Sequence, residues 1–292
     1  MDAGIDIICD KPMVMTPEDC DALASRQRET GLVFAVTHPY PYHPMARQAR
    51  EMIASGALGE IRSVVVEYAS QYQAALKDAY DWQDDPAVAG PLGALASTGT
   101  HAHHLAEFVT GLRVTELSAD LASVVPGHRL DDHATLHLRF ENGARGMLWN
   151  TTAAPGHENG LAIRVFGSEG GLAWAQEHPN HLRFTARDAQ PVTLSRGGFG
   201  NGAAAAAWTR VPSGHPEGYL EAFANLYAEI AEAILDREAG REGSYLFPTV
   251  EAGARGVAML FAALDSARAN AAFVPLETGT SRVPELAGSL AK

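Results

Sequence analysis

The stretch Ile5-Asp6-Ile7-Ile8-Cys9-Asp10-Lys11-Pro12 reads as a short apolar strand that ends in a charged turn. Proline restricts the backbone after the lysine, and ligands bind at the carboxyl ends of strands in open α/β sheets. Lys11 is therefore a candidate acid/base or cofactor-contacting group. The alternative is an ordinary surface lysine, since lysine is rarely buried without a partner. The glycine-rich phosphate loop that usually accompanies such a strand does not come before it in the sequence.

A helix and a second strand follow this turn. Thr16 suits an N-cap, Pro17 the first helical turn and Gly31 a helix end, which predicts a helix over residues 16–30. Residues 32–36 form the next apolar run. A strand, a helix and a strand joined by short connections predict two parallel strands with a right-handed crossover, as in a doubly wound sheet.

The rest of the chain has the pattern of an α+β domain with a mostly antiparallel sheet. Asn142-Gly143 suits a hairpin turn, and residues 71–92 lack any period, so we expect a long loop there. Apolar side chains on the helix at 217–236 are spaced for one buried stripe: Leu220, Phe223, Tyr227, Ile230 and Ile234. The remaining predicted helices cover 44–55, 98–110 and 249–270, and the predicted strands cover 61–68, 116–121, 134–140, 145–149, 161–167, 171–175, 181–185 and an edge at 274–276.

Composition limits the classes of partner. The chain has 292 residues, a formal net charge of −13 and a sequence that is 46% hydrophobic. An acidic surface disfavours nucleic acid and anionic membranes, so a small molecule is the expected partner. Two cysteines without a metal or disulfide pattern fit a reducing cytoplasm, and the first residues lack a signal peptide while no apolar run could span a bilayer. We therefore expect a cytoplasmic protein.

The segment Gly93-Ala94-Leu95-Ala96-Ser97-Thr98-Gly99-Thr100-His101 leads from a loop into a predicted helix. Ser97 and His101 would lie one turn apart on the same helix face. Near a helix start the imidazole stays neutral, which suits a general base or a hydrogen-bond donor. A purely structural histidine is equally compatible with the spacing. A zinc site of His101, His103 and His104 is a weaker alternative, because no Cys or Glu completes a motif.

The segment Gly200-Asn201-Gly202-Ala203-Ala204-Ala205 matches a dinucleotide-loop pattern but lies far outside the strand-helix-strand unit. We interpret it as a flexible loop.

Other polar and aromatic residues lie where ligands could bind. His38 and Tyr40 follow the second strand and could stack on a ring or simply pack between domains. Trp82 lies in the long loop. Residues 157–159 and His215 are at junctions between loops and regular elements, where they could bind hydroxyl groups or remain solvated.

Taken together, Asp10-Lys11-Pro12, residues 36–44, Gly56-Ala57-Leu58-Gly59-Glu60-Ile61 and Gly93 to His101 occur in the order of the Gfo/Idh/MocA oxidoreductases, which the chain resembles over its whole length. The resemblance implies a Rossmann domain for NAD or NADP and an α+β domain with an open sheet for substrate and homo-oligomer contacts. It also implies that Lys11 contacts nicotinamide and substrate, that His101 is the acid/base, and that a hydride passes to or from a sugar or polyol carbon.

Within this frame, residues 1–43 are the expected remaining part of the dinucleotide-binding domain, and residues 44–292 the substrate-binding and oligomerisation domain. We assign catalysis to Lys11 and His101, cofactor binding to Lys11, Pro12, His38 and Tyr40, substrate binding to Ser97, Trp82, His157, Glu158, Asn159 and His215, and no residue to a metal.

Two departures from the family pattern matter. Four positions before the histidine the family usually has Asp, and this chain has Ser97, which is uncharged. The first strand, the glycine-rich turn and the ribose-binding acid of the family also have no counterpart in the sequence, a difference on the order of 90 residues. These departures favour an alternative in which the chain is a noncatalytic carbohydrate-binding or oligomerisation module.

Overall fold

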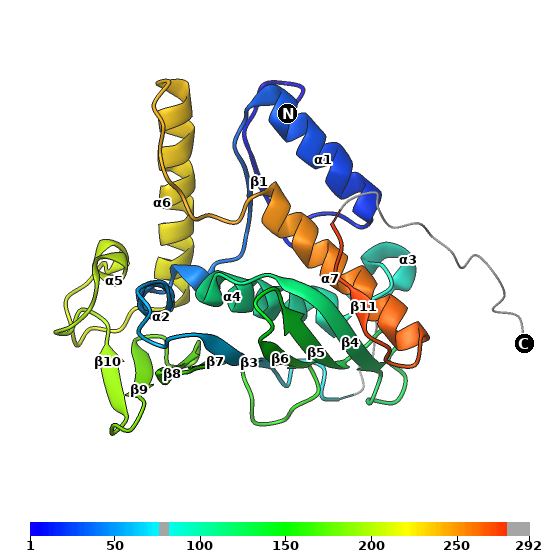
Figure 1. The fold of residues 1–292 in the computed structure, drawn as a ribbon. Coiled ribbons are helices and arrows are strands. Elements are labelled where there is room, and N and C mark those ends of the chain that lie inside the picture. The colour runs from blue at the N-terminus through cyan, green and yellow to red at the C-terminus, as the bar shows by residue number, and fades with distance from the viewer. Residues whose placement is uncertain (76–81, 279–292) are drawn as a thin grey trace, which may run out of the picture.

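The computed structural model describes residues 1–75 and 82–278, which form two sheets. A two-stranded sheet lies near the N-terminus, and a nine-stranded sheet spans most of the remaining chain (Figure 1). The expected combination of a small parallel α/β part with a large, mostly antiparallel α+β part is confirmed.

The small sheet contains β1 (Ile7–Cys9) and β2 (Phe34–Val36), which pair in parallel with Ile7 opposite Phe34. Between them lies α1 (Pro17–Thr30). The Thr16 hydroxyl accepts a hydrogen bond from the backbone N–H of Asp19, and Gly31 ends the helix with a φ of 63°. The predicted cap and stop residues therefore work as expected.

This unit packs on the long helix α7 (Val250–Arg268) through a cluster that joins Cys20 and Val36 to Val250 and Val257. The first strand is buried on one side only: Ile7 and Cys9 pack against the cluster, whereas Ile8 is 47% exposed. Only one face of this strand meets the cluster, so the alternate side chains face solvent.

The large sheet has the strand order β10-β9-β8-β7-β3-β6-β5-β4-β11. Pairing is antiparallel except between β3 and β6, where Val64 lies opposite Gly146 in a parallel ladder. The strands are β3 (Ile61–Ala69), β4 (Val114–Ala122), β5 (His133–Phe140), β6 (Arg145–Thr151), β7 (Gly160–Gly167), β8 (Gly170–Ala175), β9 (His181–Ala186), β10 (Val192–Ser195) and β11 (Val274–Pro275). The predicted edge strand at 274–276 is confirmed by the pairing of β11 with β4.

Helices cover one face of this sheet. The helices α2 (Pro44–Ala54), α4 (Thr100–Thr110) and α7 lie above it, with α4 over the centre and α7 over β4 (Figure 1). The core between them includes Val64, Leu105 and Leu148, all fully buried. In the described part of the chain, no helix covers the opposite face.

The helix α6 (Tyr219–Glu238) follows its predicted packing only in part. Ile230 of the predicted stripe is 1% exposed and Phe223 and Ile234 pack beside it, whereas Leu220 and Tyr227 are 78% and 44% exposed. The buried side also carries Ala222 and Leu226, and it packs on Tyr42 and β2. Small alanine side chains allow this close approach, and an apolar spacing pattern alone does not reveal it.

Two further predictions were wrong. Residues 200–205, interpreted as a flexible loop, instead lead into α5 (Ala203–Trp208), and the N–H groups of Gly202 and Ala204 donate to the side chains of Gln48 and Glu51. Alanine favours helix, and these side chains of α2 cap its start. The predicted loop over 71–92 contains η2 (Trp82–Asp84) and α3 (Pro86–Ala89), while residues 76–81 lie outside the described residues.

None of the helices within residues 1–75 and 82–278 is both long and apolar enough to cross a bilayer.

Candidate active site

The candidate site forms where the ends of β1 and β2 meet the start of α4. Lys11 follows β1, and its Nζ donates a hydrogen bond to the main-chain carbonyl of Ser97. The Thr37 hydroxyl, just after β2, donates to Asp10 Oδ1 at 2.7 Å. Hydrogen bonds thus join the turn after β1 to the turn after β2 and to the segment before α4, as expected for parallel strands whose carboxyl ends share one edge.

A wide helical turn, η3 (Leu95–Gly99), runs directly into α4 and positions His101 in its first turn. The carboxylate of Asp131 caps this turn: Oδ1 accepts from the N–H of Gly93 at 2.6 Å and Oδ2 from the N–H of Leu95 at 2.8 Å. Burial raises the pKa of Asp131, and these N–H donors oppose the rise. A Cβ at Gly93 would lie 2.6 Å from the Asp131 carbonyl oxygen, so the contact requires glycine.

His101 and His38 form a buried pair. Their Nδ1 atoms lie 3.0 Å apart, and the two rings meet edge to face at 88°. His38 is 2% exposed and His101 is 8% exposed. On its other side the His38 ring stacks on His104 at a centroid distance of 4.4 Å. The site therefore presents a histidine held by a second histidine.

Electrostatics keep these rings neutral. Burial, and then the nearby Lys11 ammonium and His104, hold the pKa of His101 well below its ordinary value of 6.5. Burial and the other histidines do the same for the pKa of His38. The pKa of Lys11 is also lowered by burial, against the opposing effect of Asp10. A neutral imidazole beside a partly buried cation suits proton exchange with a bound hydroxyl group.

A chain of hydroxyl groups lies next to His101. The ring of Tyr40, in η1 (Tyr40–Tyr42), packs edge to face on His101 at 5.0 Å, and its hydroxyl lies 2.6 Å from that of Tyr68 on β3. The Tyr68 hydroxyl donates to Asn159 Oδ1 at 2.6 Å. The ring centroid of Tyr219, at the start of α6, lies 6.2 Å from that of Tyr40. Aromatic faces with hydroxyl and amide groups are typical of carbohydrate-binding walls.

The structure brings together Lys11, His38, Tyr40, His101 and Asn159 from the predicted set. Sequence reasoning missed Tyr68 and Asp131. The strand alternation of β3 indicated that Tyr68 faces inward, and no sequence signal linked Asp131 to the α4 region.

Other predicted residues lie apart from this group. The Ser97 side chain is exposed, and Ser97 enters the site through its carbonyl group. Trp82 is 63% exposed on η2 and Glu158 is exposed. The His157 ring packs on Trp149 at 6.3 Å, and Trp149 pairs with Glu67 on the sheet face opposite to Tyr68.

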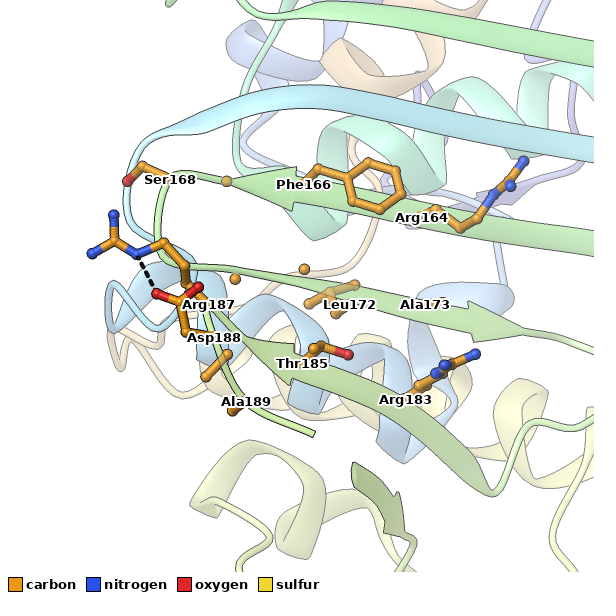
Figure 2. Close-up of a pocket in the computed structure, with 14 residues that line it drawn as sticks. Arg164, Phe166, Ser168, Leu172, Ala173, Arg183, Thr185, Arg187, Asp188 and Ala189 are labelled. Carbon is orange, nitrogen blue, oxygen red and sulfur yellow. Dashed lines mark ion pairs between the residues drawn. The ribbon is translucent and has the colours of Figure 1, made fainter. Parts of the chain in front are cut away.

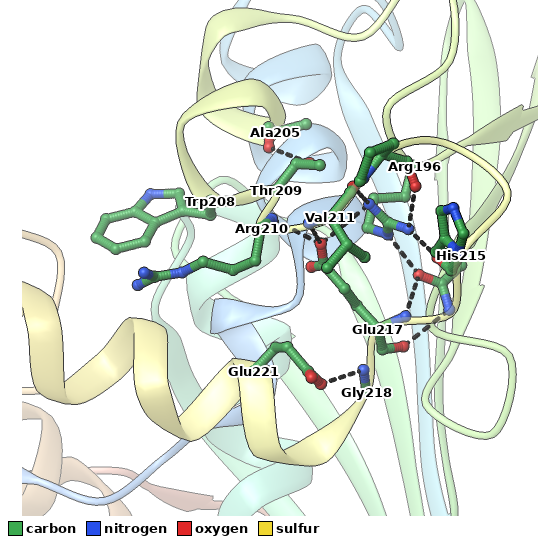
Figure 3. A network of polar contacts seen from close by, with 12 residues as sticks. Arg196, Ala205, Trp208, Thr209, Arg210, Val211, His215, Glu217, Gly218 and Glu221 are labelled. Carbon is green, nitrogen blue, oxygen red and sulfur yellow. Dashed lines mark hydrogen bonds and ion pairs between the residues drawn. The ribbon is translucent and has the colours of Figure 1, made fainter.

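His215 belongs to a polar network that fixes the loop before α6 (Figure 3). Its carbonyl accepts a hydrogen bond from Arg196, which also donates to Val211 O at 2.7 Å. Arg196 pairs with Glu217 at 3.0 Å, with both side chains 2% exposed. Glu217 also accepts from the N–H groups of Arg210 and Val211, so this network orders the loop.

Across the described ranges, no group of three or more His, Cys, Asp or Glu side chains has an arrangement that could hold a metal ion.

Comparison with known proteins identifies related sequences. Residues 46–173 match the model of the GFO/IDH/MocA C-terminal domain. The chain is 30% identical over 267 residues to the uncharacterized oxidoreductase YfiI of Bacillus subtilis, an alignment that covers 88% of this chain and 68% of YfiI.

Solved structures are similar over nearly all of the chain. An oxidoreductase from Sinorhizobium meliloti is 42% identical with a TM-score of 0.83, and the match covers 94% of this chain and 73% of that protein. An inositol dehydrogenase homolog from Azotobacter vinelandii, solved with NAD+, is 34% identical with a TM-score of 0.89 and the same coverages. A second structure of an inositol dehydrogenase homolog from that organism contains NADH and myo-inositol, with 33% identity, a TM-score of 0.87 and coverages of 94% and 72%.

Proposed function

Because the chain belongs to the Gfo/Idh/MocA family of oxidoreductases, we propose that it transfers a hydride between NAD or NADP and a sugar- or polyol-like alcohol or ketone. The observation that carries this proposal is the meeting of Lys11 and His101 where the parallel strands end. The Azotobacter vinelandii structures with NAD+ and with NADH and myo-inositol support the choice of cofactor and substrate class.

In this proposal Lys11 binds and polarises a substrate oxygen. The Ser97 carbonyl occupies one N–H of its ammonium group, and the remaining N–H groups can donate to a substrate hydroxyl or a cofactor amide. A partly buried cation also stabilises negative charge that develops on this oxygen during proton loss. His101, neutral because of its burial, takes the proton or returns it.

We propose that Lys11 and Pro12 contact the nicotinamide end of the cofactor, with His38 and Tyr40 beside it. The free donors of Lys11 and the aromatic groups after β2 fit a flat amide-bearing ring. When bound, the nicotinamide supplies or accepts the hydride. The 292 residues do not include the glycine-rich turn that would hold the diphosphate, and they span 73% of the Azotobacter vinelandii protein.

We assign residues 1–43 to the nucleotide-binding part and residues 44–292 to the substrate-binding part. For the substrate wall we propose Tyr68, Asn159 and Tyr219, since the rings of Tyr68 and Tyr219 lie near His101 and Tyr40 and Asn159 accepts a hydrogen bond from Tyr68. Binding roles for Ser97, Trp82, His157, Glu158 and His215 remain predictions.

We also propose that a second copy of the chain covers the open face of the large sheet. Two hollows of about 610 Å³ each lie on it, and Figure 2 shows Arg164, Phe166 and Arg183 lining one of them. Phe166 is 46% exposed, and Arg164 lies 3.7 Å from Glu67. A face that carries an aromatic side chain and both signs of charge is suited to self-association about a two-fold axis.

The test titrates purified protein with NAD+ and, separately, NADP+, then follows the absorbance of reduced nicotinamide with myo-inositol as the probe alcohol. We expect binding tighter than roughly millimolar and slow but measurable turnover. His101→Ala should abolish turnover while leaving cofactor affinity within about threefold, and His181→Ala, a change at an exposed histidine, is the matched control.

Cofactor binding no better than roughly millimolar would reject dehydrogenase activity for this chain. Carbohydrate binding without turnover would support the noncatalytic module instead.

A further inference from the structure

The contact between the buried rings of His38 and His101 determines which of their nitrogens carry protons. A hydrogen bond between two Nδ1 atoms needs one ring with a proton on Nδ1 and one ring without it. Both rings are neutral near pH 7, because burial and the Lys11 charge disfavour imidazolium. The two histidines must therefore be in opposite tautomers, and the state of one dictates the state of the other.

His38 is fixed independently of His101. Its backbone N–H donates to the carbonyl of Val36 at 2.9 Å, and its ring lies almost parallel to His104, with 9° between the planes. Only 2% of the residue is exposed. A ring held by stacking on one side and by its strand on the other presents Nδ1 in a constant direction.

In the described structure, no carboxylate fixes the tautomer of His101. Among the described residues, no Asp or Glu forms a hydrogen bond or ion pair with His101, and the side chain of Ser97 is exposed. The tautomer of His101 therefore depends on His38. A ring nitrogen that must accept a proton has to be bare, which requires the ring proton on the other nitrogen.

We propose that His38 is a positioning residue that accepts a hydrogen bond from Nδ1–H of His101 and so keeps Nε2 of His101 bare for a substrate hydroxyl. This inference rests on the proposed acid/base role of His101. The direction of the bond follows from that role, because a ring nitrogen that takes a proton from the substrate must not carry a proton of its own. His104 stacks on His38, and its own Nδ1 is buried with no hydrogen-bond partner among the residues that the structure describes.

The test reads the tautomers directly by NMR of protein labelled with ¹⁵N-histidine, without ligand, with signals assigned from single substitutions. We expect the Nδ1–H tautomer for His101 and the Nε2–H tautomer for His38. His38→Phe retains a ring to stack on His104 but removes the acceptor, so His101 should shift to the Nε2–H tautomer. His38→Asn places an amide oxygen close to the former Nδ1 and should restore the Nδ1–H tautomer.

His104→Phe is the matched control. It replaces the stacked ring and leaves both atoms of the bond between His38 and His101 in place, and it removes a buried nitrogen for which the described residues provide no hydrogen-bond partner. We expect the parental tautomers in this variant.

With myo-inositol and the preferred nicotinamide cofactor, His38→Phe should lower kcat on the order of tenfold or more with little change in KM, and His38→Asn should recover most of the loss. Nε2–H tautomers on both rings, or the reverse pairing with the proton on His38 Nδ1, would overturn the inference. Absent turnover with the expected tautomers would contradict the proposed function but leave the pairing intact, so the two failures are distinguishable.

Discussion

The ammonium group of Lys11 donates a hydrogen bond to the main-chain carbonyl of Ser97, which joins two segments separated by 86 positions in the sequence. Through this contact the turn after β1 meets the helical turn that positions His101. The bond uses a backbone atom of Ser97, so the side chain at this position does not affect it directly. The proposed polarising cation and the proposed acid/base are thereby held in one rigid arrangement.

Lys11→Met tests the role of the cation, because methionine has a similar apolar stem without the charge. We expect kcat/KM to fall about 100-fold or more. Burial lowers the pKa of Lys11, which means that the folded state disfavours its charged form, so removal of the charge should not lower the free energy of unfolding. Steady-state kinetics and urea unfolding measure the two effects. Arg28→Met, at an exposed position on α1, is the control. Parental turnover in Lys11→Met would refute the assignment.

Tyr68→Phe tests the hydroxyl chain beside His101. The change removes the group between the Tyr40 hydroxyl and Asn159, so both lose a hydrogen-bond partner in a largely buried place. We expect a loss of about 1–2 kcal/mol of stability and a rise in KM for the polyol of roughly tenfold. Chemical denaturation and kinetics with myo-inositol report these changes. Tyr227→Phe, on the exposed side of α6, should alter neither quantity, and an unchanged KM in Tyr68→Phe would remove Tyr68 from the substrate wall.

His43 should make stability depend on pH. Burial lowers its pKa from 6.5 to about 4, so below about pH 6.5 the unfolded chain takes up a proton that the folded protein refuses. The free energy of unfolding should therefore fall as the pH decreases from about 6.5 toward 4, by up to about 1.4 kcal/mol per pH unit from this residue.

His43→Phe should make this decline less steep, because phenylalanine does not titrate. Its ring can replace an imidazole that is 1% exposed and whose Nε2 has no hydrogen-bond partner within the described part of the chain. Urea unfolding at intervals between about pH 7 and pH 5 gives the slopes. His181→Phe changes an exposed histidine and serves for comparison. Parallel pH curves for the parent and His43→Phe would contradict the prediction.

Phe166→Asp tests self-association through the open sheet. A charge in the proposed interface should halve the particle mass measured by light scattering after size exclusion, while the fold persists because Phe166 is 46% exposed. Phe199→Asp places the same substitution on a fully exposed loop position and should leave the mass unchanged. If the parent protein is itself monomeric, the proposed self-association is rejected.

Much of the site could be predicted from the sequence because strand ends have clear signals. An apolar run followed by Asp-Lys-Pro, and a second run followed by His38, indicated where two parallel strands end, and the helix signal before His101 indicated the third component. Asp131 could not be found in this way. It caps the turn at Gly93 from 38 positions downstream, and such a contact depends on how β5 enters the sheet.

Packing of α6 was predicted only in part, for a related reason. Its apolar side chains fall on more than one side of the helix, and the sequence does not reveal which side meets β2. Ile230 of the predicted stripe is buried, together with Ala222 and Leu226, which the predicted stripe did not include.

The position of β3 has a consequence for how the protein folds. This strand is the first of the large sheet to be synthesised. In the folded sheet it lies between β6 and β7, which follow it in the sequence by roughly 80 to 100 residues. Its inward side chains, Val64, Val66 and Tyr68, thus have no partner strand until most of the chain has left the ribosome. The helix that carries His101 packs on β3, so we expect the proposed catalytic geometry to form late, in the same cooperative step that closes the centre of the sheet.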